Sequence, residues 1–376
     1  MLSTSYSASL LLINVFIWLV MLKIAWPAIH QAPLSCSPPK KQLRLFYVLF
    51  ISYCVFAFAE HDTYHMWDNF KLNYGLEHFE PTYLWLIDHV TGLNYFLWRS
   101  IVWGIACGSI ILACKMLKVE SYSSFLAITM LLPVSYFVAT RGASGHTLTV
   151  LAMLMILGGE NLYKRNILFG IALLYVSFFL HRSNIIMIAF TLAVGLYPFK
   201  ISRKFVIISL VLFPILVGIT TTFLNDFING IFKVGMGDNM DMQGKAMSYA
   251  TREASEFSIV GHITNIIEKA PVVFAQYLIT RRITFENIKV ERPYLFLYKL
   301  TYVLLYVSFL FYFQETSIWF HERLFFMSLI PMCLVLPRVM TFSNSWMKDG
   351  RLFVLLSFLS IGFKFFYRYY IFSKLG

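Results

Sequence analysis

The sequence predicts an all-α polytopic membrane protein with about 11–12 transmembrane helices, built as one integral membrane domain over residues 1–376. Three observations predict this class: a composition poor in charge, apolar segments of membrane-spanning length, and basic clusters that follow alternate segments and so fall on one side of the membrane. Of the 376 residues, 59% are hydrophobic and only 13% are charged. An ordinary soluble domain has about 25% charged residues. The composition therefore places the chain in the membrane class.

The spans follow from length, because a helix needs about 20 mostly apolar residues to cross the hydrocarbon core. Lipid cannot pair exposed backbone groups, so helices are expected. The first apolar segment is not preceded by basic residues, and we interpret it as a membrane helix rather than a cleaved signal peptide. The predicted spans are 8–26, 43–59, 98–116, 122–139, 145–159, 165–181, 183–198, 204–224, 294–313, 320–337 and 351–372.

Basic residues indicate the orientation, because cytoplasmic loops are enriched in Lys and Arg. Four clusters follow the first, third, fifth and seventh spans, so parity puts them on one side of the membrane. We predict that this side is cytoplasmic and that the N-terminus is outside. The clusters are Lys40, Lys41 and Arg44; Lys115 and Lys118; Lys164 and Arg165; and Lys200, Arg203 and Lys204.

The region 225–292 is expected to be an irregular, partly re-entrant outer region. If it were wholly external, Arg338 and Arg351 would also lie outside, against the charge rule. One extra crossing or half-crossing near 257–280 brings these arginines inside and puts Arg323 outside. The extra crossing is the favoured interpretation.

The charges within that segment favour a different arrangement. Glu268, Lys269 and Pro271 are poorly suited to a lipid-facing helix, so a short amphipathic helix with a re-entrant piece is the physically easier form. Both possibilities stay open from sequence.

Composition also bears on partners. The net charge is +12, which in a membrane protein fits loops facing anionic lipid rather than nucleic acid. The five cysteines include no C-x-x-C pair, which argues against a zinc site or a disulfide framework. We expect the lipid bilayer as a partner and no nucleic acid.

The first outer loop, residues 60–93, holds six acids and four histidines but only one lysine. Carboxylates and imidazoles exchange protons near neutral pH. Each acid taken alone could be an ordinary solvated residue, but a long, aromatic-rich loop of this kind indicates function. Asp62 is the first candidate for a catalytic base and Glu80 the second. Tyr64 and Tyr83 are candidates to stack on sugar rings.

A divalent metal site is an alternative interpretation of this loop. His61 and His65 are four residues apart, a spacing that could hold a divalent ion. Such pairs are common by chance, and we expect no metal and no cofactor.

Arginines near the outer ends of apolar helices form a second group of candidate site residues: Arg99, Arg141, Arg182 and Arg323. One arginine at such an end usually extends to lipid headgroups. Four on the outer side oppose the charge trend, and guanidinium groups from several helices could clamp a diphosphate. His181, beside Arg182 between two apolar runs, is a candidate partner for a phosphate or a sugar hydroxyl.

These motifs, in this order, resemble the EpsG-like branch of the Wzy-type bacterial polysaccharide polymerases. The matching elements are Asp62-x-Tyr64, Glu80-x-x-Tyr83, Arg141 opening a small-residue helix, His181 ending a later helix, and Arg323 heading a helix with Pro331 and Pro337. The resemblance implies a fold similar to the GT-C glycosyltransferases. It also implies a location in the bacterial cytoplasmic (inner) membrane, with the active site on the outer, periplasmic side.

The activity that the resemblance implies is glycosyl transfer between lipid-linked glycans. Undecaprenyl-diphosphate-linked oligosaccharides would be joined into surface polysaccharide, such as O-antigen, capsule or exopolysaccharide. A chain-length regulator and a flippase are the protein partners that it suggests. The residues fit such chemistry: arginines would hold the diphosphate, Asp62 or Glu80 would take the hydroxyl proton, and His181 would orient a phosphate or hydroxyl.

Two other functions stay open. A transporter, such as a flippase for lipid-linked glycans, would also place cations along a cavity. Another lipid-linked glycosyl or acyl transferase is the second alternative. Acids grouped in one outer loop fit chemistry better than a path across the membrane.

Overall fold

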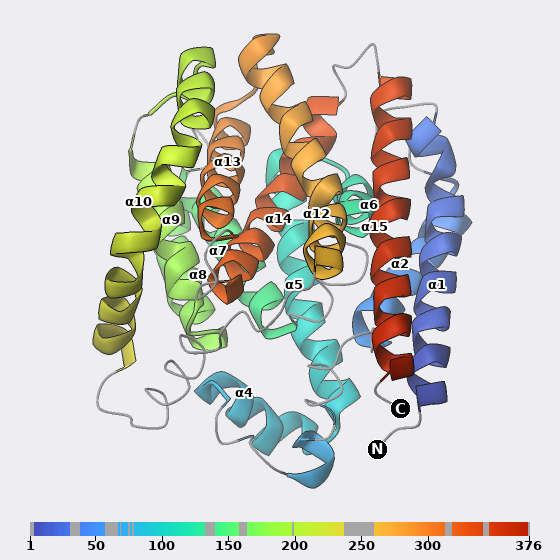
Figure 1. Ribbon diagram of the computed structural model, residues 1–376. Coiled ribbons are helices and arrows are strands. Elements are labelled where there is room, and N and C mark those ends of the chain that lie inside the picture. The colour runs from blue at the N-terminus through green and yellow to red at the C-terminus, as the bar shows by residue number, and fades with distance from the viewer. Residues whose placement is uncertain are drawn as a thin grey trace.

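The computed structural model in Figure 1 is a bundle of helices that run roughly side by side, with one short helical segment lying across the lower end. It describes residues 4–30, 38–56, 67, 69–73, 76, 79–131, 140–157, 164–197, 199–236, 259–312, 318–340 and 346–374. Within these residues the regular structure is entirely helical, which confirms the predicted all-α class.

Each of the eleven predicted spans coincides with a helix. These helices are α1 (Thr4–His30), α2 (Lys40–Phe56), α5 (Tyr95–Leu117), α6 (Ser121–Leu131), α7 (Thr140–Leu157), α8 (Lys164–Leu180), α9 (Asn184–Leu196), α10 (Arg203–Met236), α13 (Arg292–Tyr312), α14 (Ile318–Met340) and α15 (Trp346–Lys374). Their ends shift by a few residues from the predicted spans, with α10 extending furthest beyond its prediction.

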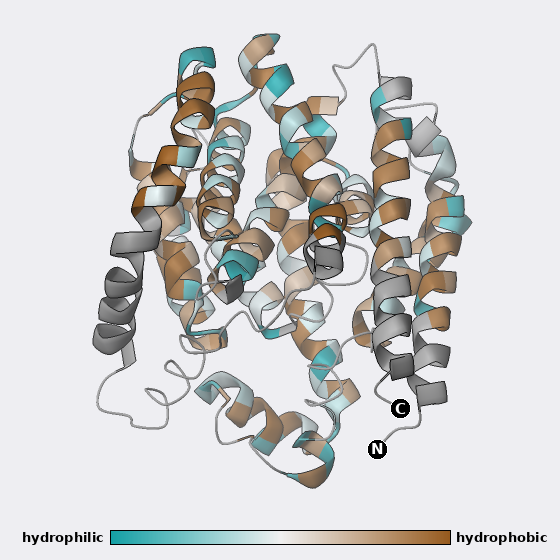
Figure 2. Ribbon diagram, viewed as in Figure 1, coloured by the Kyte–Doolittle hydropathy of each residue, from teal (hydrophilic) through white to brown (hydrophobic). Residues whose placement is uncertain are grey.

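Membrane-spanning character is clear in part of the bundle. Among the described residues, three helical segments are long and apolar enough to cross a membrane: Tyr95–Leu117, Arg292–Tyr312 and Phe320–Met340. Large apolar side chains also face outward from α8 and α10, such as Leu168 at 68% and Val211 at 67% exposure. Apolar surface of this kind is expected where helices face lipid rather than water. Figure 2 shows hydrophilic residues at the upper ends of α10 and α12, and others on α4 and the lower part of α5.

The predicted irregular region contains a regular helix, α12 (Ile259–Thr280), which continues into a π-helical turn, η4 (Arg281–Phe285). Pro271 lies inside α12 without ending it. The segment after α12 lies at the same end of the bundle as the start of α15, because Arg282 pairs with Asp349 at 3.3 Å. Arg338 likewise pairs with Glu291 at 2.6 Å. Arg282, Glu291, Arg338 and Asp349 therefore lie at one end of the bundle, as an extra crossing near 257–280 would place them.

One of the two charged residues that argued against such a helix, Lys269, is accommodated inside the protein. Lys269 is only 5% exposed, and its Nζ lies 5.4 Å from the ring centre of Tyr312 and 5.5 Å from that of Phe325. Aromatic faces attract cations, so Lys269 need not meet lipid. The sequence pattern could not show which way this side chain faces.

Helix α7 lies at the centre of the arrangement. It packs against α5, α8, α9 and α14, and nearly all of its described side chains are buried. The short helix α4 (Pro81–Leu86) and its π-helical continuation η2 (Ile87–Thr91) lie across the end of the bundle where α7 begins. Polar groups in the first turns of α7 therefore meet groups presented by α4.

Candidate functional site

Glu80 is the centre of the candidate site. It is the N-cap residue of α4, with φ −61° and ψ 147°, and Pro81 occupies the first position of the helix. A residue before proline is driven into extended backbone, and proline is favoured at the first helical position. The Glu80 side chain does not cap its own helix. It is therefore available to bond with other elements.

The Glu80 carboxylate joins two other elements of the bundle. Its Oε2 accepts from Arg141 Nη1 of α7 at 3.0 Å, and its Oε1 lies 2.7 Å from His181 Nδ1 in the turn between α8 and α9. The Glu80 side chain is only 8% exposed, against 26% for Arg141 and 16% for His181. Three residues predicted independently as site residues thus form one connected group.

The protonation states follow from this environment. Burial raises the pKa of Glu80, but the hydrogen bond with His181 and the charge of Arg141 outweigh it and lower the pKa to about 2. Burial lowers the pKa of His181, helped by the charges of Arg141 and Arg323 and opposed by Glu80. At neutral pH Glu80 is therefore an anion and His181 is neutral. A carboxylate can only accept, so His181 donates Nδ1–H and keeps a lone pair on Nε2.

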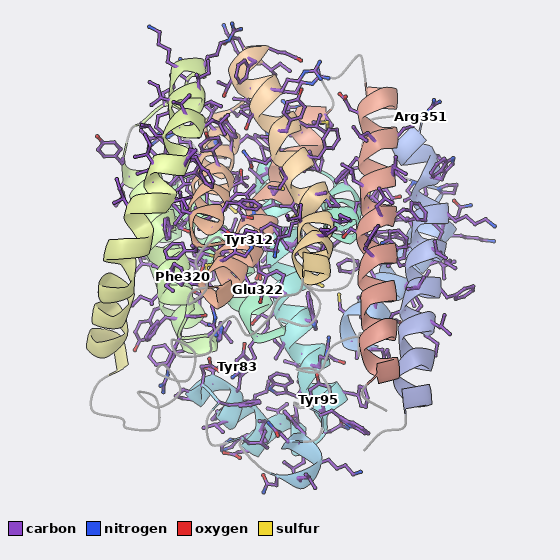
Figure 3. The ribbon with its side chains drawn as sticks, viewed as in Figure 1. Tyr83, Tyr95, Tyr312, Phe320, Glu322 and Arg351 are labelled. Carbon is purple, nitrogen blue, oxygen red and sulfur yellow. The ribbon has the colours of Figure 1, made fainter. Side chains whose placement is uncertain are left out.

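Arg323 joins this group from α14. It is half-buried, and its charge acts on His181. Figure 3 shows Phe320 and Glu322, its neighbours in α14, on the side of the bundle toward Tyr83 of α4, with Arg351 at the opposite end. Arg323 therefore lies at the same end as Glu80, as the extra crossing predicted.

Tyr83 stabilises the site through contacts with the first turns of α7. Its hydroxyl lies 2.9 Å from Ser144 Oγ and donates to the Arg141 carbonyl oxygen at 3.2 Å. Its ring is completely buried against Trp98, with centroids 5.4 Å apart. Burial revises its expected role: no ring face is open to a sugar, and Tyr83 instead holds the first turn of α7.

Arg141 is also held by an aromatic ring, since its guanidinium carbon lies 4.6 Å from the ring centre of Phe79. Glu80 engages one nitrogen, Nη1. A guanidinium carries five N–H donors, so donors of Arg141 remain for an anionic ligand.

The other predicted residues are placed differently. Arg99 is completely buried; its Nε donates to the Cys54 carbonyl oxygen and its Nη1 to the Tyr95 hydroxyl, both at 2.8 Å. These contacts join α5 to α2 and favour a structural role for Arg99. Arg182 is exposed in the turn after His181. Asp62 and Tyr64 lie outside the described residues, as do His61 and His65.

A second histidine, His146, was not predicted as a site residue. It is 4% exposed and has electrostatic contact with both His181 and Arg323. The sequence signal that could have found it is the run Arg141 to His146, in which glycine, alanine and serine leave room for polar groups to meet. Among the described residues, no group of three or more His, Cys, Asp or Glu side chains could hold a metal ion.

Fold and site together define an all-α membrane protein with a buried acid–histidine–arginine group at one end of its bundle. Comparison with known proteins finds no matching family model, no matching curated protein and no matching solved structure.

Proposed function

We propose that this chain is a glycosyltransferase that polymerises lipid-diphosphate-linked oligosaccharide units on the outer face of the cytoplasmic membrane. The observation that carries the proposal is the Glu80 carboxylate bonded at once to His181 and Arg141. An oriented imidazole supplies a base, and guanidinium groups beside it supply anion binding. Glycosyl transfer from a diphosphate needs these two functions together.

In the proposed reaction, the acceptor hydroxyl oxygen attacks the anomeric carbon of the donor sugar. The bond from that carbon to the diphosphate oxygen breaks, and its electron pair leaves with the diphosphate. The hydroxyl proton moves to His181 Nε2. Glu80 holds the imidazole through Nδ1–H and stabilises the imidazolium that forms, an arrangement general to acid–base pairs of this type.

Glu80 itself is poorly suited to take the proton, because a carboxylate with a pKa of about 2 is a weak base. In the proposal the base is therefore His181, and Glu80 is a positioning residue. Asp62, the first candidate from sequence, lies outside the described residues and keeps its place as an alternative base.

The arginines take the second function. Arg141 and Arg323 would bind the diphosphate and stabilise the negative charge that grows on it as the sugar leaves. Because Glu80 is an anion, it partly balances these charges before substrate binds. The diphosphate is a good leaving group, so this step requires no proton donor.

The alternatives are a flippase for the same lipid-linked glycans and another lipid-linked glycosyl or acyl transferase. A flippase would use the arginines but would have no need of a base oriented through Nδ1. The Glu80–His181 pair therefore favours chemistry over transport.

The direct test uses purified full-length protein in detergent with a synthetic polyprenyl-diphosphate-linked repeat unit, followed by gel analysis. A ladder of polymer that disappears in His181→Gln supports the proposal. His89→Gln is a matched control, because His89 is exposed, bonds the Trp85 carbonyl oxygen at 3.0 Å and stacks on the Trp85 ring. No ladder, together with movement of the unit across liposomes carrying the protein, would overturn the proposal in favour of the flippase.

A further inference from the structure

We propose that His146 is a second imidazole of this site, which donates an N–H to the diphosphate while His181 accepts the proton of the hydroxyl. The inference rests on the proposed function for the identity of its ligand. It assigns a binding role to a residue that the mechanism above does not use.

The two imidazoles meet over Gly142. An ideal Cβ built on Gly142 would lie 3.3 Å from Cε1 and 3.6 Å from Nε2 of His146, and 3.8 Å from Cδ2 of His181. The Cε1–Nε2 edge of His146 and the Cδ2 atom of His181 thus both approach the same point beside Gly142. The absent side chain at residue 142 is what lets them approach.

The hydrogen bonding of His146 is incomplete within the described residues. Its Nδ1 is buried and has no partner there. Two more buried oxygens without described partners belong to the neighbouring turn, Ser183 Oγ and Asn184 Oδ1. A buried polar group left unpaired destabilises the protein. Of these neighbours, the Ser183 hydroxyl can donate to a phosphate oxygen, whereas Asn184 Oδ1 can only accept from a hydroxyl of the ligand.

The unpaired Nδ1 also indicates which tautomer His146 adopts. Buried N–H groups without an acceptor are rarer than acceptors without a donor, so Nδ1 is the bare nitrogen and the proton is on Nε2. His181 has the opposite arrangement, because its Nδ1–H is given to Glu80. The Nε2 atom of His146 is therefore a donor and the Nε2 atom of His181 is an acceptor.

The charge around His146 favours an anion at that donor. Arg323 acts electrostatically on both histidines, and Arg141 begins the helix that carries His146. A phosphate oxygen accepts from imidazole N–H and guanidinium groups alike. We therefore assign a diphosphate oxygen as the acceptor for the N–H of His146 Nε2.

The test measures binding of farnesyl diphosphate to the full-length protein in detergent by calorimetry, with farnesol as the uncharged control. Three variants separate the ring nitrogens: His146→Gln places an amide nitrogen near the position of Nε2, His146→Asn places one near Nδ1, and His146→Phe keeps only the ring shape. We expect Asn and Phe to weaken binding about ten-fold or more, and Gln to stay within about three-fold of wild type.

Equal affinity in all three variants and wild type would overturn the inference, as would absence of farnesyl diphosphate binding by wild type. If His146→Phe does not fold, the Gln and Asn variants still decide between the two nitrogens. The pH profile of polymerisation gives a second readout: Gln should keep the wild-type acid limb, because His181 supplies it. A protein that shows this binding pattern but makes no ladder would refute the polymerase while leaving the role of His146 standing. A polymer ladder from wild type, together with equal farnesyl diphosphate affinity in all the His146 variants, would refute the role of His146 and leave the polymerase standing.

Discussion

His181 donates its Nδ1–H to Glu80 Oε1 over 2.7 Å, although the two residues are 101 positions apart in the chain. The same carboxylate holds Arg141 through its other oxygen at 3.0 Å. One anion therefore sets the tautomer of the imidazole and the position of the guanidinium.

Glu80→Gln should lower the polymerisation rate by about 10²-fold or more, because the amide no longer fixes the tautomer of His181 or stabilises its charged form. Glu80 raises the pKa of His181 against the lowering caused by burial. Removing the carboxylate should therefore move the acid limb of the pH–rate profile to lower pH. Rates of the variant across pH 5–8 (about the range where histidine titrates) measure both effects. Glu291→Gln is the matched control, since Glu291 is an exposed acid paired with Arg338. An acid limb that stays in place in Glu80→Gln would contradict the assignment of His181 as the base.

Arg141→Lys should abolish polymer although the charge is kept. A lysine ammonium lacks the planar fork that can bond Glu80 and a phosphate together. Gel analysis of the product ladder is the measurement, with Arg338→Lys as the control at the opposite end of the bundle. Polymer of normal length from Arg141→Lys would refute the requirement for a guanidinium.

Gly145→Ala should distort the site by displacing Asn184 at the start of α9. A Cβ at residue 145 would lie 2.3 Å from Nδ2 of Asn184, and that nitrogen donates to the Ser177 carbonyl oxygen at 3.1 Å. Asn184 follows the turn that carries His181, so the clash should move the imidazole. We expect a loss of about 1–3 kcal/mol in stability and a loss of activity, measured by thermal unfolding and by the ladder assay.

The control and the rescue for this prediction are both available in the chain. Gly104→Ala should be harmless, because its Cβ would meet nothing within 4 Å. Asn184→Ala combined with Gly145→Ala should recover part of the stability, since the clashing group is removed. A double variant as unstable as the sum of the two single variants would show that the contact does not matter.

Arg99→Leu should act on stability rather than on substrate affinity. It would leave the buried Cys54 carbonyl oxygen without its donor and remove the bond to the Tyr95 hydroxyl, with a cost of about 1–3 kcal/mol. Thermal unfolding and KM for the donor should be measured together. A raised KM with unchanged unfolding temperature would return Arg99 to the substrate-binding role predicted from sequence.

The helices could be predicted from the sequence because crossing lipid imposes a minimum apolar length, and residues such as those of α5 and α13 satisfy it without reference to the rest of the fold. The extra helix α12 was harder, since Lys269 and Pro271 contradict a lipid-facing span. The helix tolerates Lys269 because the ammonium group lies against the rings of Tyr312 and Phe325. Those contacts come from helices that lie elsewhere in the chain.

The short helix α4 was not predicted within the outer loop. Six residues are too few to show a helical pattern, and Pro81 at its first position was the one local signal. The helix α4 matters because it places Glu80 and Tyr83 in contact with α7. No local sequence pattern predicts these contacts between distant elements.

The sequence by itself determined the membrane class, the helices and the residue types of the site, because charge, hydropathy and unusual polar residues are local properties. The tertiary structure alone decided that Glu80, Arg141 and His181 bond to one another, and that His146 meets His181 over Gly142. The burial of Tyr83 removes its ring from ligand contact, and the low pKa of Glu80 supports our proposal that Glu80 positions His181 rather than acting as the base. The physical reason is that a pKa, a tautomer and an exposed face are properties of neighbours in space, and those neighbours come from distant parts of the chain.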